Sequence, residues 1–143
     1  MRDGGAQAKS IIAQARNTAA ELGKDSNADL KVIGQRLIEA CTALEQVVDF
    51  IAAHGKSDIK AAFAGSVPYL KLAGVVFGGW QMARAALAAK RLLAAPGADV
   101  AFCEAKIVSA RFYANHVLSQ AGGLRDAVLH GSPGVLALSE EQF

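Results

Sequence analysis

The sequence predicts an all-α protein, and three observations carry that prediction. Alanine occupies 30 of the 143 positions and aromatic residues make up 6%, a composition that favours closely packed helices over a β-sandwich. Apolar residues recur at three- and four-residue spacing along most of the chain. No segment shows sustained alternation of apolar and polar residues, as a strand would. We expect an up-and-down antiparallel four-helix bundle, with a kinked long third helix and a short helical C-terminal appendage, built from residues 1–143 as a single helical domain.

The first two helices follow from amphipathic patterns bounded by turn residues. The first is expected from about residue 5 to residue 22, with Gly23 as its stop. After a polar turn, Asn27 can cap a second helix that ends at His54 and Gly55. Its apolar face is expected to carry Leu30, Ile33, Leu37, Cys41, Leu44, Val48 and Ile51.

The third segment begins at Ser57 or Asp58, is the most apolar part of the chain and contains Pro68. A proline inside a helix removes one hydrogen bond and collides with the preceding turn. Two interpretations follow. Either one long helix over residues 58–93 kinks near Pro68, or a short helix ends and a new one starts with Ser66 as its cap and Pro68 near its first turn. We favour the kinked helix, which by its length would form the spine of the domain.

A fourth helix and a short appendage complete the bundle. Asp99 can cap a helix from about residue 100 to residue 118 or 119. Gly122 and Gly123 are expected to break it, and a short helix is expected over residues 124–129. Ser132 as a cap and Pro133 as the first helical residue predict one or two further turns over residues 132–138. The apolar positions of the fourth helix are Phe102, Cys103, Ile107, Ala110, Ala114, Val117 and Leu118.

Charge, cysteine usage and hydropathy narrow the class of protein. The net charge is +2 and the basic residues are scattered, so we expect no nucleic-acid partner. Cys41 and Cys103 lie in apolar helical patterns, which predicts buried thiols and a reducing, cytoplasmic location. The N-terminus lacks the apolar core of a signal peptide. The longest apolar run, Leu72 to Trp80, is less than half of the about 20 residues that a membrane span needs.

The sequence also shows no motif that is typical of a catalytic site. None of His54, His116 and His130 has a second histidine at metal-ligand spacing. No Glu-x-x-His pair, nucleophile elbow or phosphate-binding loop is present. We therefore assign no catalytic residue, no cofactor-binding residue and no metal ligand to this chain.

Four residues of the third segment stand out as packing candidates. Gly74 and Gly78 lie four apart, and each glycine costs a helix about 1 kcal/mol relative to alanine. They indicate close approach, either of a neighbouring helix or of a ligand or partner chain, and they could make room for Trp80. Arg84 lies on the same apolar stripe. It could pair with Glu104 or with an acidic group of another domain, or extend its head to solvent from the surface.

Three blocks of sequence resemble one known family. Residues 67–84 read VPYLKLAGVVFGGWQMAR and are similar to the signature VPYLRLFGxVxGGWxxAR of the C-terminal helical domain of certain acyl-CoA dehydrogenases. Residues 112–121, FYANHVLSQA, resemble its second signature FYAEHxLPQA, and residues 137–143, ALSEEQF, its closing ALxEExF. The opening residues 1–5 resemble the linker that leads out of the flavin-binding core. The chain departs from the family at Ala73, Asn115 and Ser119, which replace an aromatic residue, Glu and Pro.

The resemblance implies that the chain is the C-terminal fragment of a longer enzyme. That enzyme would use FAD to remove two hydrogens across the α,β carbons of an acyl-CoA thioester, with a glutamate base upstream of residue 1. This domain would be non-catalytic and would pack on the dehydrogenase core of the same polypeptide or support a homo-oligomer. The candidates for that packing are Gly74, Gly78, Trp80, Arg84, Tyr113 and His116.

Two other classes of function remain open from the sequence. The chain could be a free-standing helical module for protein interaction or oligomerisation. It could also be a small ligand-binding bundle with a pocket near Gly78 and Trp80. If the chain is instead the fragment of a dehydrogenase, part of the apolar content of 52% is surface that the core covers, and we expect the isolated chain to self-associate.

Overall fold

The computed structural model describes residues 3–135 and 137–142. Every regular element in these residues is helical, so the expectation of an all-α packed bundle is confirmed. The elements are α1 (Ala6–Gly23), α2 (Ala28–His54), α3 (Ile59–Ala64), α4 (Ser66–Leu93), α5 (Val100–His116), the 3₁₀ turn η1 (Leu118–Gln120), α6 (Ala121–His130), α7 (Ser132–Val135) and the 3₁₀ turn η2 (Glu140–Gln142).

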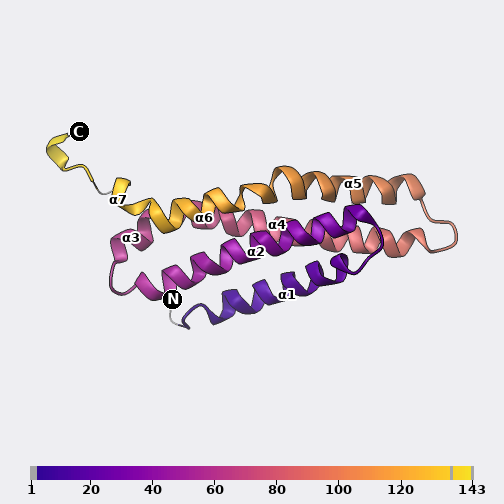
Figure 1. Ribbon diagram of the computed structural model, residues 1–143, viewed down its shortest axis with the longest axis horizontal. Helices are drawn as coiled ribbons and strands as arrows, with labels where there is room; N and C mark the ends of the chain where they lie inside the picture. The colour runs from indigo at the N-terminus through magenta and orange to yellow at the C-terminus, as the bar shows by residue number, and fades with distance from the viewer. Residues whose placement is uncertain (1–2, 136, 143) are drawn as a thin grey trace.

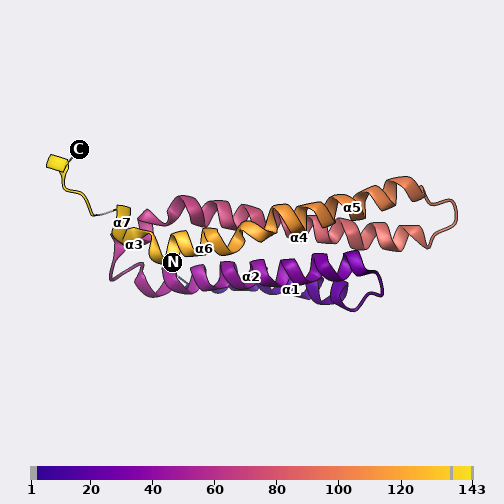
Figure 2. The same ribbon diagram turned by 45° about the horizontal axis from the view of Figure 1, so that its top comes forward.

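The long helices form an elongated bundle of two antiparallel pairs (Figures 1 and 2). One pair is α1 and α2, and the other is α4 and α5, with α6 continuing the path of α5 along α4 and α2. The α1–α2 and α4–α5 turns share one end of the bundle. The short helix α3 lies at the other end, where α1 begins and where α7 contacts α3.

Side-chain caps set the start of three helices, as the sequence predicts for two of them. Asn27 accepts hydrogen bonds from the amides of Asp29 (2.8 Å) and Leu30 (3.2 Å), and Asp99 accepts one from Phe102 (3.0 Å). A third cap is made by Asp58, on the Ala61 amide, while in α1 Asp3, ahead of the cap position, accepts from the Gln7 amide. Each cap satisfies a donor that has no partner within the helix.

The expected kinked helix over residues 58–93 is wrong. Helix α3 ends at Ala64, and α4 starts afresh at Ser66, so Pro68 lies in the first turn of α4 where no intrahelical hydrogen bond is lost. The break falls at Gly65 because α6 crosses there: a Cβ on Gly65 would lie 2.9 Å from Val128 Cγ1. This is the second of the two interpretations, with Ser66 as the first helical residue rather than the cap.

The fourth helix is also interrupted at a place other than the expected one. It leaves the α conformation after His116 and passes through η1, whereas Gly122 and Gly123 lie inside α6. Neither glycine faces a neighbour that a Cβ would touch. The interruption instead lets Leu118 pack on Gly79 of α4, which shows tertiary packing overriding a local helix-breaking signal.

The core runs the length of the bundle and is built from aliphatic side chains and alanine. Its largest fully buried members include Ile12, Leu37, Leu72 and Val128. Cys41 and Cys103 are free and buried, which confirms the expectation of buried thiols. Phe102 is more than half exposed, unlike its expected place on the buried face. Helix α7 begins at Ser132 itself, and Leu136 of the expected last turns lies outside the described residues.

Among the described residues, the longest and most apolar helices still fall short of what crossing a membrane requires.

Candidate domain-packing surface

Two of the predicted residues meet at the contact between α4 and α5. The Tyr113 hydroxyl lies against Gly78 and donates a hydrogen bond to the Val75 carbonyl, 3.1 Å away. A Cβ on Gly78 would collide with the hydroxyl oxygen and lie 3.2 Å from Tyr113 Cζ. Burial of the hydroxyl raises the pKa of Tyr113 above its usual value. Gly78 therefore serves close packing inside the bundle.

The neighbouring glycine makes a second close approach on the same helix. A Cβ on Gly79 would lie 2.6 Å from Cδ2 of Leu118, which the 3₁₀ turn η1 directs onto α4. Gly78 and Gly79 thus make room for Tyr113 and Leu118 of the following segment. This differs from the expectation from the sequence, in which the glycines make room for the ring of the adjacent Trp80.

Gly74 is placed differently from Gly78. It is exposed, and a Cβ there would meet no atom within 4 Å. No contact among the described residues compensates the cost of a helical glycine at this position.

Trp80 and Arg84 face the groove between α4 and α1. The indole Nε1 of half-buried Trp80 donates a hydrogen bond to Thr18 Oγ1 at 2.9 Å. The Arg84 guanidinium carbon lies 5.8 Å from the centre of the Trp80 ring, within the range of a cation–π contact. Trp80 therefore connects the two helix pairs, since its ring stays on α4 and its donor reaches α1.

Arg84 is exposed and its Nη1 donates to Gln81 Oε1, one turn earlier, at 3.0 Å. Within the described residues it forms no ion pair with Glu104 or with another carboxylate. Arg84 therefore does not pair with Glu104 in this structure, and its exposed head is open to solvent or to an acidic group of another domain.

His116 lies on the outer face of α5, away from the other candidates. Its ring is exposed and stacks on Phe112, with ring centroids 4.4 Å apart. Of the six candidates, the structure thus brings Gly78 to Tyr113 and Trp80 to Arg84, and leaves Gly74 and His116 on open surface.

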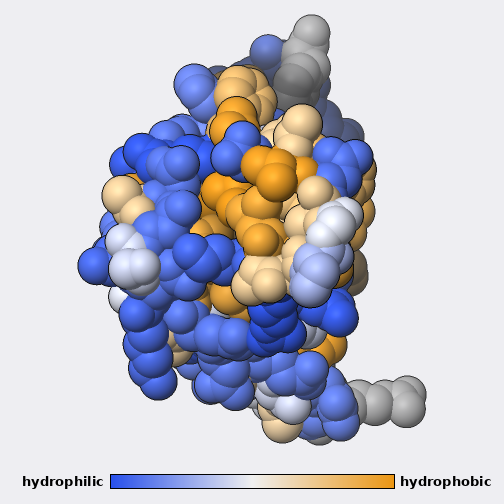
Figure 3. All heavy atoms as spheres, turned by 90° about the vertical axis from the view of Figure 1, so that its right-hand side faces the viewer, coloured by the Kyte–Doolittle hydropathy of each residue, from blue (hydrophilic) through white to orange (hydrophobic). Residues whose placement is uncertain are grey.

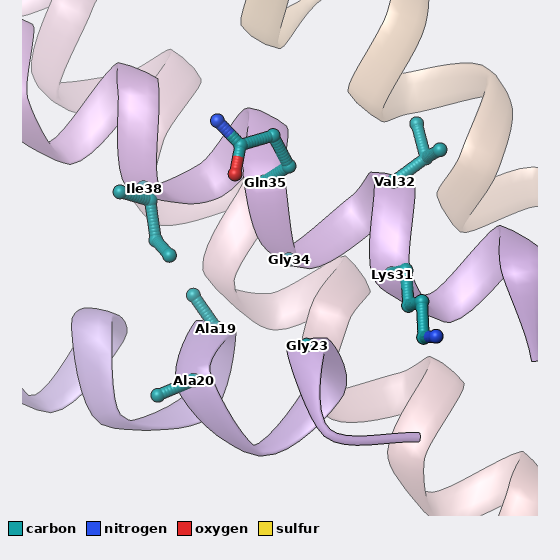
Figure 4. A pocket seen from close by; sticks show the side chains of 8 residues that line it. All are labelled: Ala19, Ala20, Gly23, Lys31, Val32, Gly34, Gln35 and Ile38. Carbon is teal, nitrogen blue, oxygen red and sulfur yellow. The ribbon is translucent and has the colours of Figure 1, made fainter. Parts of the chain in front are cut away.

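The two hollows that adjoin α1 are open to solvent. One, of about 340 Å³, lies between α1 and α2 and is lined by alanines, glycines, Val32, Ile38 and two polar side chains, Lys31 and Gln35 (Figure 4). Another, of about 550 Å³, lies between α1 and α4, where Arg91 is already paired with Glu21 at 2.7 Å. In the described part of the chain, no three His, Cys, Asp or Glu residues cluster as metal ligands would.

The sequence reading missed a third close approach, at Gly34 of α2. A Cβ there would lie 2.7 Å from the Ala19 carbonyl oxygen of α1. The signal was present, because Gly34 lies beside Leu30 and Ile33 on the apolar face, and a glycine within such a face usually has a packing reason.

The grouping of exposed apolar side chains on the surface was also not predicted from the sequence. Ile59, Phe63, Val67 and Leu70 are 57%, 68%, 76% and 73% exposed and follow one another across α3 and the start of α4. A second group, Phe102, Val108 and Phe112, lies on α5. Figure 3 shows apolar residues gathered at the opposite end of the bundle, near the α4–α5 turn, where Leu92 and Val100 are exposed. Large apolar groups on a surface often mark contact with another protein.

These features define the class as an all-α helical bundle. Its described residues show close helix contacts at glycines, exposed apolar side chains and no group of three His, Cys, Asp or Glu residues that could hold a metal ion. The chain belongs to the acetyl-CoA dehydrogenase C-terminal-like family, whose model matches residues 10–139. The resemblance to this family is therefore confirmed, with the blocks at residues 67–84 and 112–121 inside the matched range. Residues 1–5 and 140–143 of the quoted blocks lie outside that range.

One relative is the 3-methylmercaptopropionyl-CoA dehydrogenase of Ruegeria pomeroyi. It is 36% identical to this chain over 139 residues, which is 97% of this chain and 23% of the relative. The chain thus spans about a quarter of the length of the enzyme that it matches.

Proposed function

We propose that this chain is the non-catalytic C-terminal domain of an FAD-dependent acyl-CoA dehydrogenase. The observation that carries the proposal is the family match over residues 10–139, together with the 23% of the related dehydrogenase that the chain covers. A dehydrogenase of that kind would take its substrate as an acyl-CoA thioester and remove a hydrogen from each of the α and β carbons. The base that removes the α-proton would lie in the dehydrogenase core.

The residues of this chain do not by themselves fit a flavin. FAD needs a deep site that encloses its ring system and donors that hold its pyrophosphate. The hollow between α1 and α4 is open, and its Arg91 is engaged by Glu21. We therefore assign flavin and substrate binding to the core and derive no chemical step from the residues of this bundle.

The role that we propose for the domain is packing, on the core or between copies of the enzyme. Within it, Gly78, Tyr113 and Trp80 hold the helices of the bundle together. Gly74, Arg84 and His116 lie on exposed surface, where they can contact a partner. The internal group keeps the bundle rigid, and a rigid bundle can present its surface in one geometry.

The alternative of a small-ligand pocket near Gly78 and Trp80 has weak support, because Tyr113 fills the space above Gly78. A free-standing interaction module stays an alternative, since exposed apolar groups would serve it equally well.

The proposal is tested by expressing the 143-residue chain alone and the complete open reading frame that contains it. We expect the isolated chain to fold, to carry no flavin absorbance and to show no acyl-CoA dehydrogenation with an electron acceptor. The complete product should be yellow and active. A complete reading frame that encodes only the bundle would refute the proposal and favour the free-standing module.

A further inference from the structure

Four large apolar side chains are more than half exposed within a short segment across the α3–α4 junction. We define the α3–α4 stripe in this segment as Phe63, Val67, Leu70 and Gly74. Two hydrogen bonds of α-helical spacing bridge the junction, from the Gly65 amide to the Ala61 carbonyl (3.3 Å) and from the Tyr69 amide to the Gly65 carbonyl (3.0 Å). Within α4 the spacing of three and four residues places Val67, Leu70 and Gly74 on one face. Phe63, near the end of α3, lines one hollow together with Ser66 and Tyr69 of α4.

The segment that carries the stripe also contains this hollow and two lysines. The hollow, of about 290 Å³, includes Ile59, Phe63 and Tyr69 in its lining. Lys60 of α3 and Lys71 of α4 belong to the same segment and do not line this hollow. Both are exposed and make no ion pair within the described residues. An apolar centre with a charged edge is the usual anatomy of a protein interface.

Gly74 ends the stripe with open space where a side chain would be. Because nothing within the bundle approaches it, its helix cost is compensated only if something outside the bundle does. A glycine beside exposed Leu70 lets a partner helix or loop come close to the α4 backbone.

The charges argue against a second copy of this chain as the occupant. Residues 59–74 contain two lysines and no acidic residue, so a second copy that presents the same segment offers no carboxylate to Lys60 or Lys71. A partner surface edged by carboxylates would instead pair with Lys60 and Lys71.

The position of the stripe indicates where such a partner lies. The stripe begins in α3, at the end of the bundle where α1 also begins (Figures 1 and 2). The related dehydrogenase has roughly three quarters of its length outside the matched region. A core domain joined ahead of α1 would enter beside the stripe.

We propose that the α3–α4 stripe is the surface by which this domain packs on the dehydrogenase core of the same polypeptide, against an apolar surface edged by carboxylates. This inference rests on the proposed function and adds to it the face of the bundle that the core covers.

The test compares thiol labelling in the isolated chain and in the complete polypeptide. Leu70→Cys places a reporter in the stripe, and Ser26→Cys places a matched exposed reporter in the α1–α2 turn at the far end. The native Cys41 and Cys103 are buried and supply the slow background. We expect maleimide to label Leu70→Cys about tenfold or more slowly in the complete polypeptide, because reaction requires an accessible thiolate. Labelling of Ser26→Cys should be equal in both.

Equal labelling of Leu70→Cys in an active, flavin-containing polypeptide would overturn the inference and leave the proposed function intact. Labelling that slows as the isolated chain is concentrated would overturn it in favour of a second copy. If the complete polypeptide contains no flavin or has no activity, the proposed function is refuted. The dehydrogenase core is then also ruled out as the partner that covers the stripe.

Charge reversal supplies a second variant that leaves the core of the bundle untouched. We expect Lys60→Glu with Lys71→Glu to speed labelling of Leu70→Cys in the complete polypeptide by about threefold or more, through repulsion at the edge. The control is Lys31→Glu, a reversal at an exposed site of α2. It should leave the rate unchanged, and an equal effect of both reversals would count against carboxylates at this edge.

Discussion

The hydroxyl of Tyr113 in α5 occupies the space that a side chain at Gly78 in α4 would need. The same hydroxyl donates to the Val75 carbonyl at 3.1 Å. The two helices can therefore come this close only because position 78 has no Cβ. This contact explains why position 78, one of the two glycine positions that stand out in the sequence, carries no side chain.

Gly78→Ala should destabilise the isolated chain by about 1–3 kcal/mol, because the new methyl group forces Tyr113 or α5 to shift. The matched control is Gly74→Ala, one turn earlier on the same helix, which meets open space. It should stabilise the chain by up to about 1 kcal/mol through helix propensity. Urea unfolding followed by circular dichroism measures both, and equal effects of the two substitutions would contradict the assigned contact.

Tyr113→Phe should cost about 0.5–1.5 kcal/mol on its own, because it removes the hydrogen bond to Val75. In the Gly78→Ala background it should cost less or even stabilise, since the atom nearest to the new methyl group is the hydroxyl oxygen. A double-mutant cycle on the same unfolding curves measures this coupling. Simple additivity would show that the hydroxyl is not what limits position 78.

Gly34→Ala should destabilise the chain by about 1–3 kcal/mol, since the added Cβ meets the Ala19 carbonyl oxygen, a backbone atom that cannot rotate away. Gly122→Ala in α6 is the control, because nothing lies within 4 Å of its Cβ position. Thermal unfolding of both variants measures the difference in stability. A stable Gly34→Ala variant would mean that α1 and α2 can separate without cost.

Thr18→Val removes the hydrogen bond that the Trp80 indole N–H donates to Thr18 Oγ1. The loss should leave the N–H more exposed and lower the free energy of unfolding by about 0.5–1.5 kcal/mol. Trp80 is the single tryptophan of the sequence, so intrinsic fluorescence reports on this site alone. We expect a shifted emission maximum in the folded variant. An unchanged spectrum together with unchanged stability would argue against the contact between α1 and α4.

The stability of the chain should fall at alkaline pH, in part through Cys41. Burial raises the pKa of its thiol from 9.0 to about 11. Between these values the unfolded chain releases the proton and the folded chain keeps it, so this contribution is present below pH 9 and is lost as pH rises toward 11. Stability measured by urea unfolding over this range should fall less steeply for Cys41→Ala. Equal slopes would show that Cys41 ionises alike in both states.

Helix type, capping and the buried faces could be predicted because they depend on residues near one another in the chain. Asn27 and Asp99 cap the helices that the sequence assigned to them, and Cys41 lies on the predicted buried face. The six packing candidates were chosen in part from family signatures. The structure sorts them into internal contacts, such as Gly78 with Tyr113, and open positions, such as Gly74.

Local pattern was enough to predict an all-α bundle, because helical periodicity and capping need no knowledge of distant residues. The family was indicated by the resemblance of three sequence blocks, and the match over residues 10–139 shows it. The sequence offered a break at Ser66 as one of two interpretations, and Pro68 in the first turn of α4 agrees with its local preference. Only the tertiary structure decided between the two interpretations, and only it placed the second interruption after His116, where Leu118 packs on Gly79 of α4. That contact joins segments far apart in sequence, and the free energy of packing them exceeds the local helix-breaking preference of Gly122 and Gly123.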